Sequence, residues 1–176
     1  VFSDAPLLPT SANKPYVSKN PWSSQLRGKS VLVIHPFADT MASQFEKREL
    51  LFENRDTLPP FNLETYKTIQ TSGGGSCEHE TWEDALNSML GDVSKINFDV
   101  ALIGCGCYDI PIATHIKGMG RQAFIMGGLL QCMFGIKGKR WDRRHVGKTF
   151  YNEHWVRPPG TDRPTNYRKI EKGCYW

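Results

Sequence analysis

Residues 99–141 read DVALIGCGCYDIPIATHIKGMGRQAFIMGGLLQCMFGIKGKRW, and this stretch decides the fold. It contains two short apolar runs, at 100–103 and 123–126, and glycines follow each run directly. A parallel strand that is buried on both faces is apolar throughout and short, as these runs are. Glycine then permits a tight turn into a helix, whose first amide groups can bind phosphate or carboxylate. The stretch therefore predicts two strand–turn–helix units with a ligand site at the strand ends.

The glycines do not form the usual dinucleotide-binding motif. That motif requires Gly-x-Gly-x-x-Gly, and after Gly104 and Gly106 the third position is Asp109. A standard NAD site is therefore excluded. Two interpretations stay open, namely a phosphate-binding turn and ordinary tight-turn chemistry.

The sequence upstream repeats the same alternation of strands and helices. An apolar strand is expected at 30–34, a helix at 40–52, a half-buried strand at 63–70 and an amphipathic helix from Thr81. Alternating strands and helices imply right-handed crossovers and helices on both sheet faces. We expect an α/β, Rossmann-like three-layer domain with a mostly parallel sheet. The predicted organisation is an extended N-terminal arm (1–28), the Rossmann-like domain (29–141) and an irregular, basic, aromatic C-terminal tail (142–176) packed on that domain.

Composition indicates an ordinary globular protein. Of 176 residues, 39% are hydrophobic, and no run reaches the length of a membrane span. The five cysteines are odd in number and lie in mostly apolar surroundings, which favours free thiols in a reducing compartment. We expect a soluble intracellular protein, cytoplasmic, or organellar if a targeting segment preceding Val1 has been removed.

Positive charge is concentrated near the C-terminal end. Residues 137–176 contain 11 Lys and Arg against 4 Asp and Glu. A basic segment of this kind can bind nucleic acid, an anionic membrane or a phosphorylated small molecule. Its position directly after the glycine turns favours the small molecule, and no nucleic-acid-binding signature accompanies it.

Several strings of the sequence are similar to a known family. They are IGCGCYDIPIATHIKGMGRQAFIMGGLLQCMFGIKGKRW, GKSVLVIHPF, QFEKRELLF and the ending NEHWVRP…GCYW. From about Pro21 to Trp176 the chain resembles the C-terminal half of the GT-D-type glycosyltransferase-like family. The resemblance implies a Rossmann-like fold and transfer of a sugar from a nucleotide-diphosphate donor to a glycan acceptor, as in polysaccharide biosynthesis.

The resemblance also implies a set of donor-binding residues. Those at the two strand ends contact the donor, the cations that follow face its diphosphate, and Mn²⁺ or Mg²⁺ accompanies the nucleotide sugar. Carried onto this sequence, the donor-binding positions are Gly104, Gly106, Tyr108, Gly127, Gly128 and Gln131, with Lys137, Lys139 and Arg140 at the diphosphate.

The chain departs from the family pattern in two ways. Asp109 stands where the family has a small glycine, and no acidic Asp-x-Glu motif occurs before Gly28. No catalytic residue and no metal ligand is therefore assigned. The alternative function is a noncatalytic structural subunit of a larger assembly, with protein partners bound through the arm and the tail. His35, which follows the first strand, is either a ligand contact or a hydrogen-bonded turn histidine.

Overall fold

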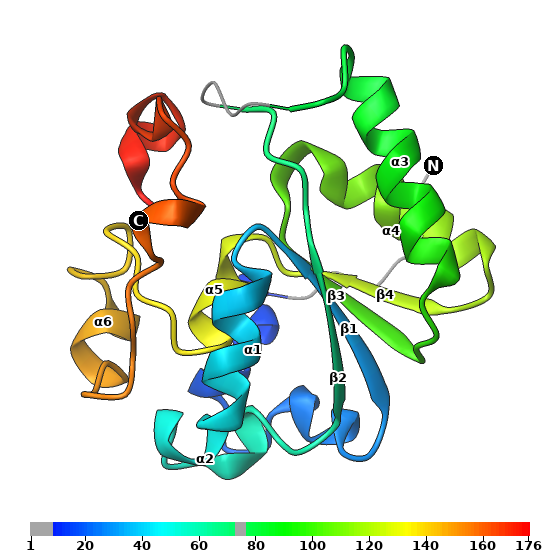
Figure 1. The fold of residues 1–176 in the computed structure, drawn as a ribbon. Helices are drawn as coiled ribbons and strands as arrows, with labels where there is room; N and C mark the ends of the chain where they lie inside the picture. Colours follow the sequence, from blue (N-terminus) through cyan, green and yellow to red (C-terminus); the bar gives the residue numbers. More distant parts are fainter. Residues whose placement is uncertain (1–8, 73–76) are drawn as a thin grey trace.

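The computed structural model describes residues 9–72 and 77–176. Its centre is one four-stranded parallel sheet in the order β2-β1-β3-β4 (Figure 1). The predicted Rossmann-like parallel α/β fold is confirmed. The strands are β1 (Ser30–His35), β2 (Asn62–Lys67), β3 (Val100–Ile103) and β4 (Gln122–Ile125).

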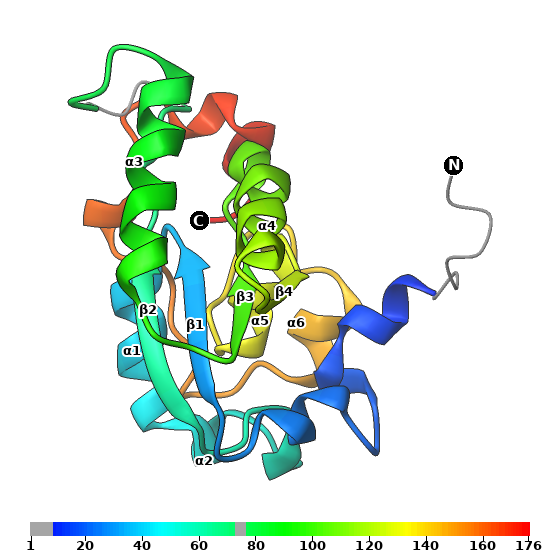
Figure 2. The same ribbon diagram turned by 90° about the vertical axis from the view of Figure 1, so that its right-hand side faces the viewer.

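Helices cover both faces of the sheet (Figures 1 and 2). One face carries α1 and α5, and the opposite face carries α3 and α4. Successive residues of a strand point to opposite faces, so Val31 and Val33 join the first layer whereas Leu32 and Ile34 join the second. The helices are α1 (Ala38–Glu46), α2 (Arg48–Leu51), α3 (Trp82–Lys95), α4 (Asp109–Gly118), α5 (Gly128–Met133) and α6 (His145–Thr149).

The sheet order creates a switch point between β1 and β3. From β1 the chain passes through α1 and α2 to β2, whereas from β3 it passes through α4 to β4 on the other side. These connections diverge over opposite faces of the sheet. Parallel α/β sheets bind ligands at the carboxyl ends of strands where connections diverge in this way.

Two predicted element boundaries are wrong. The helix expected at 40–52 is broken at Lys47 into α1 and α2, because buried Gln44 donates hydrogen bonds to the carbonyls of Gly135 and His154 (3.2 and 3.0 Å) and holds the end of α1 there. The strand expected at 63–70 ends at Lys67. Its partner β1 ends beside it and is followed by Pro36, which has no amide proton to continue the ladder.

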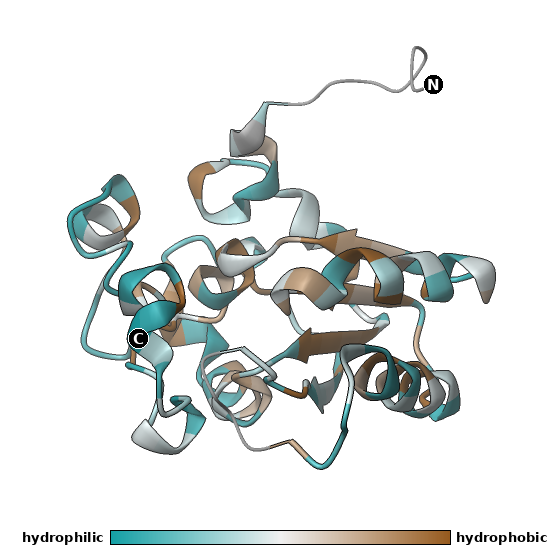
Figure 3. Cartoon of the chain, turned by 90° about the horizontal axis from the view of Figure 1, so that it is seen from above, coloured by the Kyte–Doolittle hydropathy of each residue, from teal (hydrophilic) through white to brown (hydrophobic). Residues whose placement is uncertain are grey.

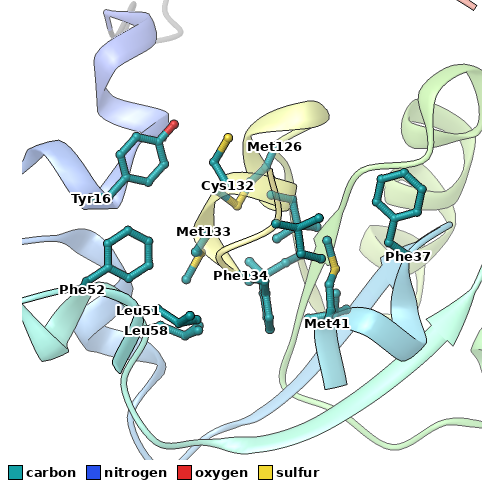
Figure 4. Close-up of a cluster of buried hydrophobic side chains, with 14 of the residues drawn as sticks. Tyr16, Phe37, Met41, Leu51, Phe52, Leu58, Met126, Cys132, Met133 and Phe134 are labelled. Atoms are coloured by element: carbon teal, nitrogen blue, oxygen red, sulfur yellow. The ribbon is translucent and has the colours of Figure 1, made fainter. Parts of the chain in front are cut away.

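The described part of the N-terminal arm packs on its own domain. It consists of short 3₁₀ turns at Thr10–Asn13, Pro15–Val17 and Trp22–Leu26, so it is not extended between residues 9 and 28. The ring of Tyr16 stacks with Phe52 at 6.1 Å, and Trp22 meets Phe124 edge-on at 4.7 Å. Figure 4 shows Tyr16 above Phe52 at the margin of the core that Met41, Met133 and Phe134 fill. Residues 1–8 of the predicted arm lie outside the described residues.

The C-terminal tail is irregular, as predicted, and polar over much of its length (Figure 3). Its last residues run beside the segment that follows α5, since the amide of Arg140 donates to the Cys174 carbonyl at 2.8 Å and the amide of Lys139 to the Trp176 carbonyl at 3.3 Å. No helix in the described ranges is long and apolar enough to cross a membrane.

The buried carboxylate of Asp162 connects the tail to the sheet through an ion pair with Lys67. The Asp162 side chain is 2% exposed, and its Oδ1 lies 2.8 Å from Nζ of Lys67 at the end of β2. The Asp162 carbonyl also accepts the indole N–H of Trp176 at 3.1 Å. Hydrogen bonding to Asp162 is the largest of the effects that raise the pKa of Lys67, so the Lys67 ammonium is charged at neutral pH.

We expect Lys67→Met to loosen the tail. The substitution leaves the buried Asp162 carboxylate with one remaining side-chain hydrogen-bond partner among the described residues, the Thr40 hydroxyl at 3.4 Å. Removing one partner of a buried charged pair costs about 1–3 kcal/mol or more of unfolding free energy. Chemical denaturation measures that loss, and increased hydrogen exchange at Trp176 reports tail release. Asp39→Asn is the matched control, because Asp39 is the 72% exposed second partner of Lys67 and an exposed pair contributes little. Equal stability losses for the two variants would contradict this role of Asp162.

Candidate functional site

A cavity of about 300 Å³ lies at the carboxyl ends of the strands, beside the β1/β3 switch point. Five segments supply its walls: the turn after β1, the loop after β2, the glycine turn after β3, the start of α5 and the tail. Its lining comprises His35, Pro36, Phe37, Ile69, Gln70, Thr71, Ser72, Gly104, Cys105, Gly106, Cys107, Tyr108, Asp109, Gly127, Gly128, Ile170, Glu171, Tyr175 and Trp176.

Glycine at position 104 is required by close packing at the strand ends. A Cβ atom there would lie 2.6 Å from the Gly127 carbonyl oxygen and 2.9 Å from Cδ2 of His35. Gly127 itself has a φ of 54°, in the left-handed region that side chains disfavour. The turns after β1, β3 and β4 therefore approach one another closely enough to form one wall.

His35 is a buried, neutral histidine at this wall. It is 5% exposed, and its Nδ1 accepts the backbone N–H of Phe37 at 2.9 Å. Burial lowers the pKa of the imidazole from 6.5 to about 3, so the ring carries one proton at neutral pH. Because Nδ1 is the acceptor, that proton is on Nε2. Nε2 makes no hydrogen bond to any residue within 9–72 or 77–176.

The sequence left two interpretations of His35 open, a hydrogen-bonded turn histidine and a ligand contact. The Nδ1 atom makes the hydrogen bond of a turn histidine, and the ring also lines the cavity. A ligand contact through Nε2 stays a prediction.

The two carboxylates in the lining already have partners. Oδ1 of Asp109 accepts the backbone N–H of Cys105, which holds the turn between β3 and α4. Glu171 forms an ion pair with Arg140 and accepts the hydroxyl of Tyr175 at 2.7 Å. Among the described residues, the lining contains no Lys or Arg.

The carboxylates do not fit the Mn²⁺ or Mg²⁺ that the family resemblance implies. Mg²⁺ takes oxygen ligands in near-octahedral geometry, usually from one or two free carboxylates and from substrate phosphates. Asp109 and Glu171 are each held by protein donors, and the described residues contain no group of three or more His, Cys, Asp or Glu that could hold a metal ion. No step of a reaction is therefore derived through a metal.

Aromatic side chains close the opposite side of the cavity. Tyr108 is buried, its hydroxyl lies 3.0 Å from that of Thr71, and its ring stacks on Trp82 with centroids 5.2 Å apart. In the tail, Trp176 meets Phe37 edge-on at 5.9 Å and Tyr175 packs against Gly128. These rings give part of the wall an aromatic surface, which is common in small-molecule sites.

Cys105 is not a nucleophile in this arrangement. Burial, together with the neighbouring Asp109 carboxylate, raises the pKa of its thiol far above the ordinary range. The thiolate is the reactive form of cysteine, so Cys105 is inert at neutral pH. All five cysteines are free, as expected, although only Cys132 is classed as buried.

The structure brings together some of the sequence-predicted site residues and separates others. Gly104, Gly106, Tyr108, Gly127 and Gly128 all line the cavity. Gln131 does not, because its side chain is buried and donates to the carbonyls of Lys137 and Tyr175 (3.0 and 2.8 Å).

The predicted diphosphate-facing cations also lie outside the lining. Lys137 lies over the ring of Tyr151, with Nζ 5.5 Å from the ring centroid, and Lys139 is exposed. Arg140 comes nearest, since it contacts the lining residues Glu171 and Tyr175.

Four tail residues in the lining were not identified from the sequence: Ile170, Glu171, Tyr175 and Trp176. They follow no periodic pattern and lie far along the chain from the glycine turns. The only available signal was the ending GCYW in the family resemblance, which carried no site assignment.

Comparisons with known proteins assign no family or function to the chain. No family model matches the chain, and no match was found among curated proteins or solved structures.

Proposed function

We propose that this chain binds a nucleotide-diphosphate sugar in the carboxyl-edge cavity and transfers the sugar to a glycan acceptor. The observation that supports the proposal is the cavity itself. It lies at the β1/β3 switch point, and residues that the glycosyltransferase resemblance assigns to donor binding, Gly104, Gly106 and Gly127 among them, form its walls.

Arg140 is the cation best placed to meet the diphosphate. It contacts Glu171 and Tyr175 at the edge of the cavity. A phosphate that replaced the Glu171 carboxylate as the partner of Arg140 would therefore lie beside the lining. In the transfer, the bond between the anomeric carbon and the diphosphate oxygen breaks. The acceptor oxygen forms the new bond to that carbon, and its proton passes to the departing diphosphate. A guanidinium stabilises the charge that grows on the leaving diphosphate.

The proposal is tested by thermal unfolding with UDP-, GDP- and dTDP-sugars, with and without Mn²⁺. A ligand that binds only the folded state stabilises it by about 2.7 kcal/mol at 100 times its dissociation constant. For a chain of this size such a gain raises the midpoint by roughly 5–10 °C. One class of donor should raise the midpoint, and the protein should then release the matching nucleoside diphosphate.

Arg140→Ala should weaken donor binding about tenfold, because a charge-assisted hydrogen bond to phosphate is lost. Arg143→Ala is the control, since it removes the same charge from a neighbouring exposed position. The proposal is wrong if no donor changes the midpoint and no nucleoside diphosphate is released. That outcome would favour the alternative of a noncatalytic subunit.

A further inference from the structure

We propose that the cavity binds the uncharged heterocyclic base of the nucleotide rather than its diphosphate, and that the Nε2–H of His35 donates a hydrogen bond to a carbonyl oxygen of that base. The inference rests on the proposed function, because it states which part of the donor the cavity holds. Its test is independent of sugar transfer.

The first argument is the unpartnered donor of His35. The side chain is 95% buried, since only 5% is exposed, and the Phe37 amide fixes the ring through Nδ1. The Cδ2 side of the ring faces Gly104, and Nε2 is the neighbouring ring atom. Nε2 is not among the fully buried atoms that lack a partner, so its N–H opens on the cavity, where a ligand oxygen can accept it.

The second argument is the charge of the lining. An oxygen acceptor could belong to a phosphate or to a neutral carbonyl. A diphosphate inside the cavity would meet the carboxylates of Asp109 and Glu171. The described lining offers it no Lys or Arg, because Arg140 reaches only the edge of the cavity, where it contacts Glu171 and Tyr175. Burying an uncompensated anion beside like charge is costly, whereas a neutral carbonyl avoids that cost.

The third argument is the shape and composition of the walls. Phe37, Tyr108 and Trp176 are buried aromatic residues of the lining, and the apolar ring atoms that reach the cavity can pack against a flat ring. The cavity volume of about 300 Å³ lies at the lower end of the range for ligand sites. A base with part of its ribose suits this volume, and the diphosphate would extend past Glu171 toward Arg140.

The experiment is isothermal titration of the whole chain with uridine, thymidine and guanosine, and separately with inorganic pyrophosphate. At least one nucleoside should bind saturably, and pyrophosphate should give no binding at the same concentrations. His35→Phe keeps an aromatic ring but removes the donor, and it should weaken nucleoside binding about tenfold. His35→Gln keeps a side-chain N–H donor, and it should stay within threefold of the unmodified protein.

Two controls keep the result interpretable. His145→Gln replaces an exposed histidine of α6 that is absent from the lining, and it should leave nucleoside affinity unchanged. The imidazole ¹⁵N spectrum of the unmodified protein tests the contact without any substitution. It should show His35 as the Nε2–H tautomer, and the Nε2 resonance should shift when the nucleoside is added, whether or not the His35 variants fold.

The outcomes separate this inference from the transferase proposal. Nucleotide-sugar binding without nucleoside binding, an unperturbed Nε2 resonance, or tight binding of pyrophosphate alone would overturn the base-binding inference and leave sugar transfer standing. Nucleoside binding with no turnover of any sugar donor would overturn sugar transfer and leave the base-binding inference standing.

Discussion

Lowering the pH from 7.5 to 4.5 is expected to remove about 3 kcal/mol from the free energy of unfolding through His35 alone. The pKa of His35 is about 3 in the folded chain and 6.5 when unfolded. Between these values the unfolded chain binds a proton that the folded chain excludes. The stability is therefore fully present above pH 6.5 and is lost as the pH falls toward 3. Urea denaturation at pH 4.5, 5.5, 6.5 and 7.5 measures the effect.

His35→Gln isolates this contribution, because glutamine does not titrate. The other titratable groups that share the described lining with the ring include Asp109 of α4, Glu171 of the tail and the Cys105 thiol, and they are present in both proteins. The stability advantage of the unmodified protein over His35→Gln should shrink by about 3 kcal/mol from pH 7.5 to 4.5. A difference that stays constant over that interval would show that His35 accepts a proton in the folded state.

Gly104→Ala is expected to lower the free energy of unfolding by about 1–3 kcal/mol and to abolish ligand binding in the cavity. The added methyl would lie 2.6 Å from a backbone carbonyl oxygen and 2.9 Å from the His35 ring. Neither neighbour is the flexible end of a long side chain. The ends of β3 and β4 must therefore separate, which moves the wall that the cavity depends on. Chemical denaturation and nucleoside titration measure the two effects.

Gly91→Ala is the matched control for that substitution. Gly91 lies within α3, and nothing comes within 4 Å of a Cβ atom built there. Alanine is the better helix former, so this variant should gain about 0.5–1 kcal/mol and bind ligand normally. Destabilisation by Gly91→Ala, or normal binding by Gly104→Ala, would contradict the steric argument.

The central strands were predictable because strands that are buried on both faces appear in the sequence as short, continuous apolar runs. The runs at 30–34 and 100–103 are apolar on both faces, and they form β1 and β3 at the centre of the sheet. Thr81 was equally readable, since its hydroxyl accepts the Asp84 amide at 3.1 Å and caps α3. In each of these elements, residues that are close together in the sequence determine the local structure.

No local sequence pattern predicted that residues of the C-terminal tail line the cavity. Its position depends on long-range contacts, such as the hydrogen bond between Gln131 and Tyr175 and the ion pair between Lys67 and Asp162. The family resemblance placed Lys137 at the diphosphate. However, α5 ends at Met133 and the chain then turns to pair with Val156, which takes Lys137 away from the strand ends.

The wide spread of the cavity's walls along the chain has a consequence for folding kinetics. His35 and Trp176 lie in the same lining although they are 141 positions apart in the sequence, and the parallel strand pairs between them also join distant segments. Contacts of high sequence separation form slowly, because loop-closure entropy must be overcome first. The cavity is therefore assembled late in folding, and a bound ligand should retard global unfolding without accelerating refolding.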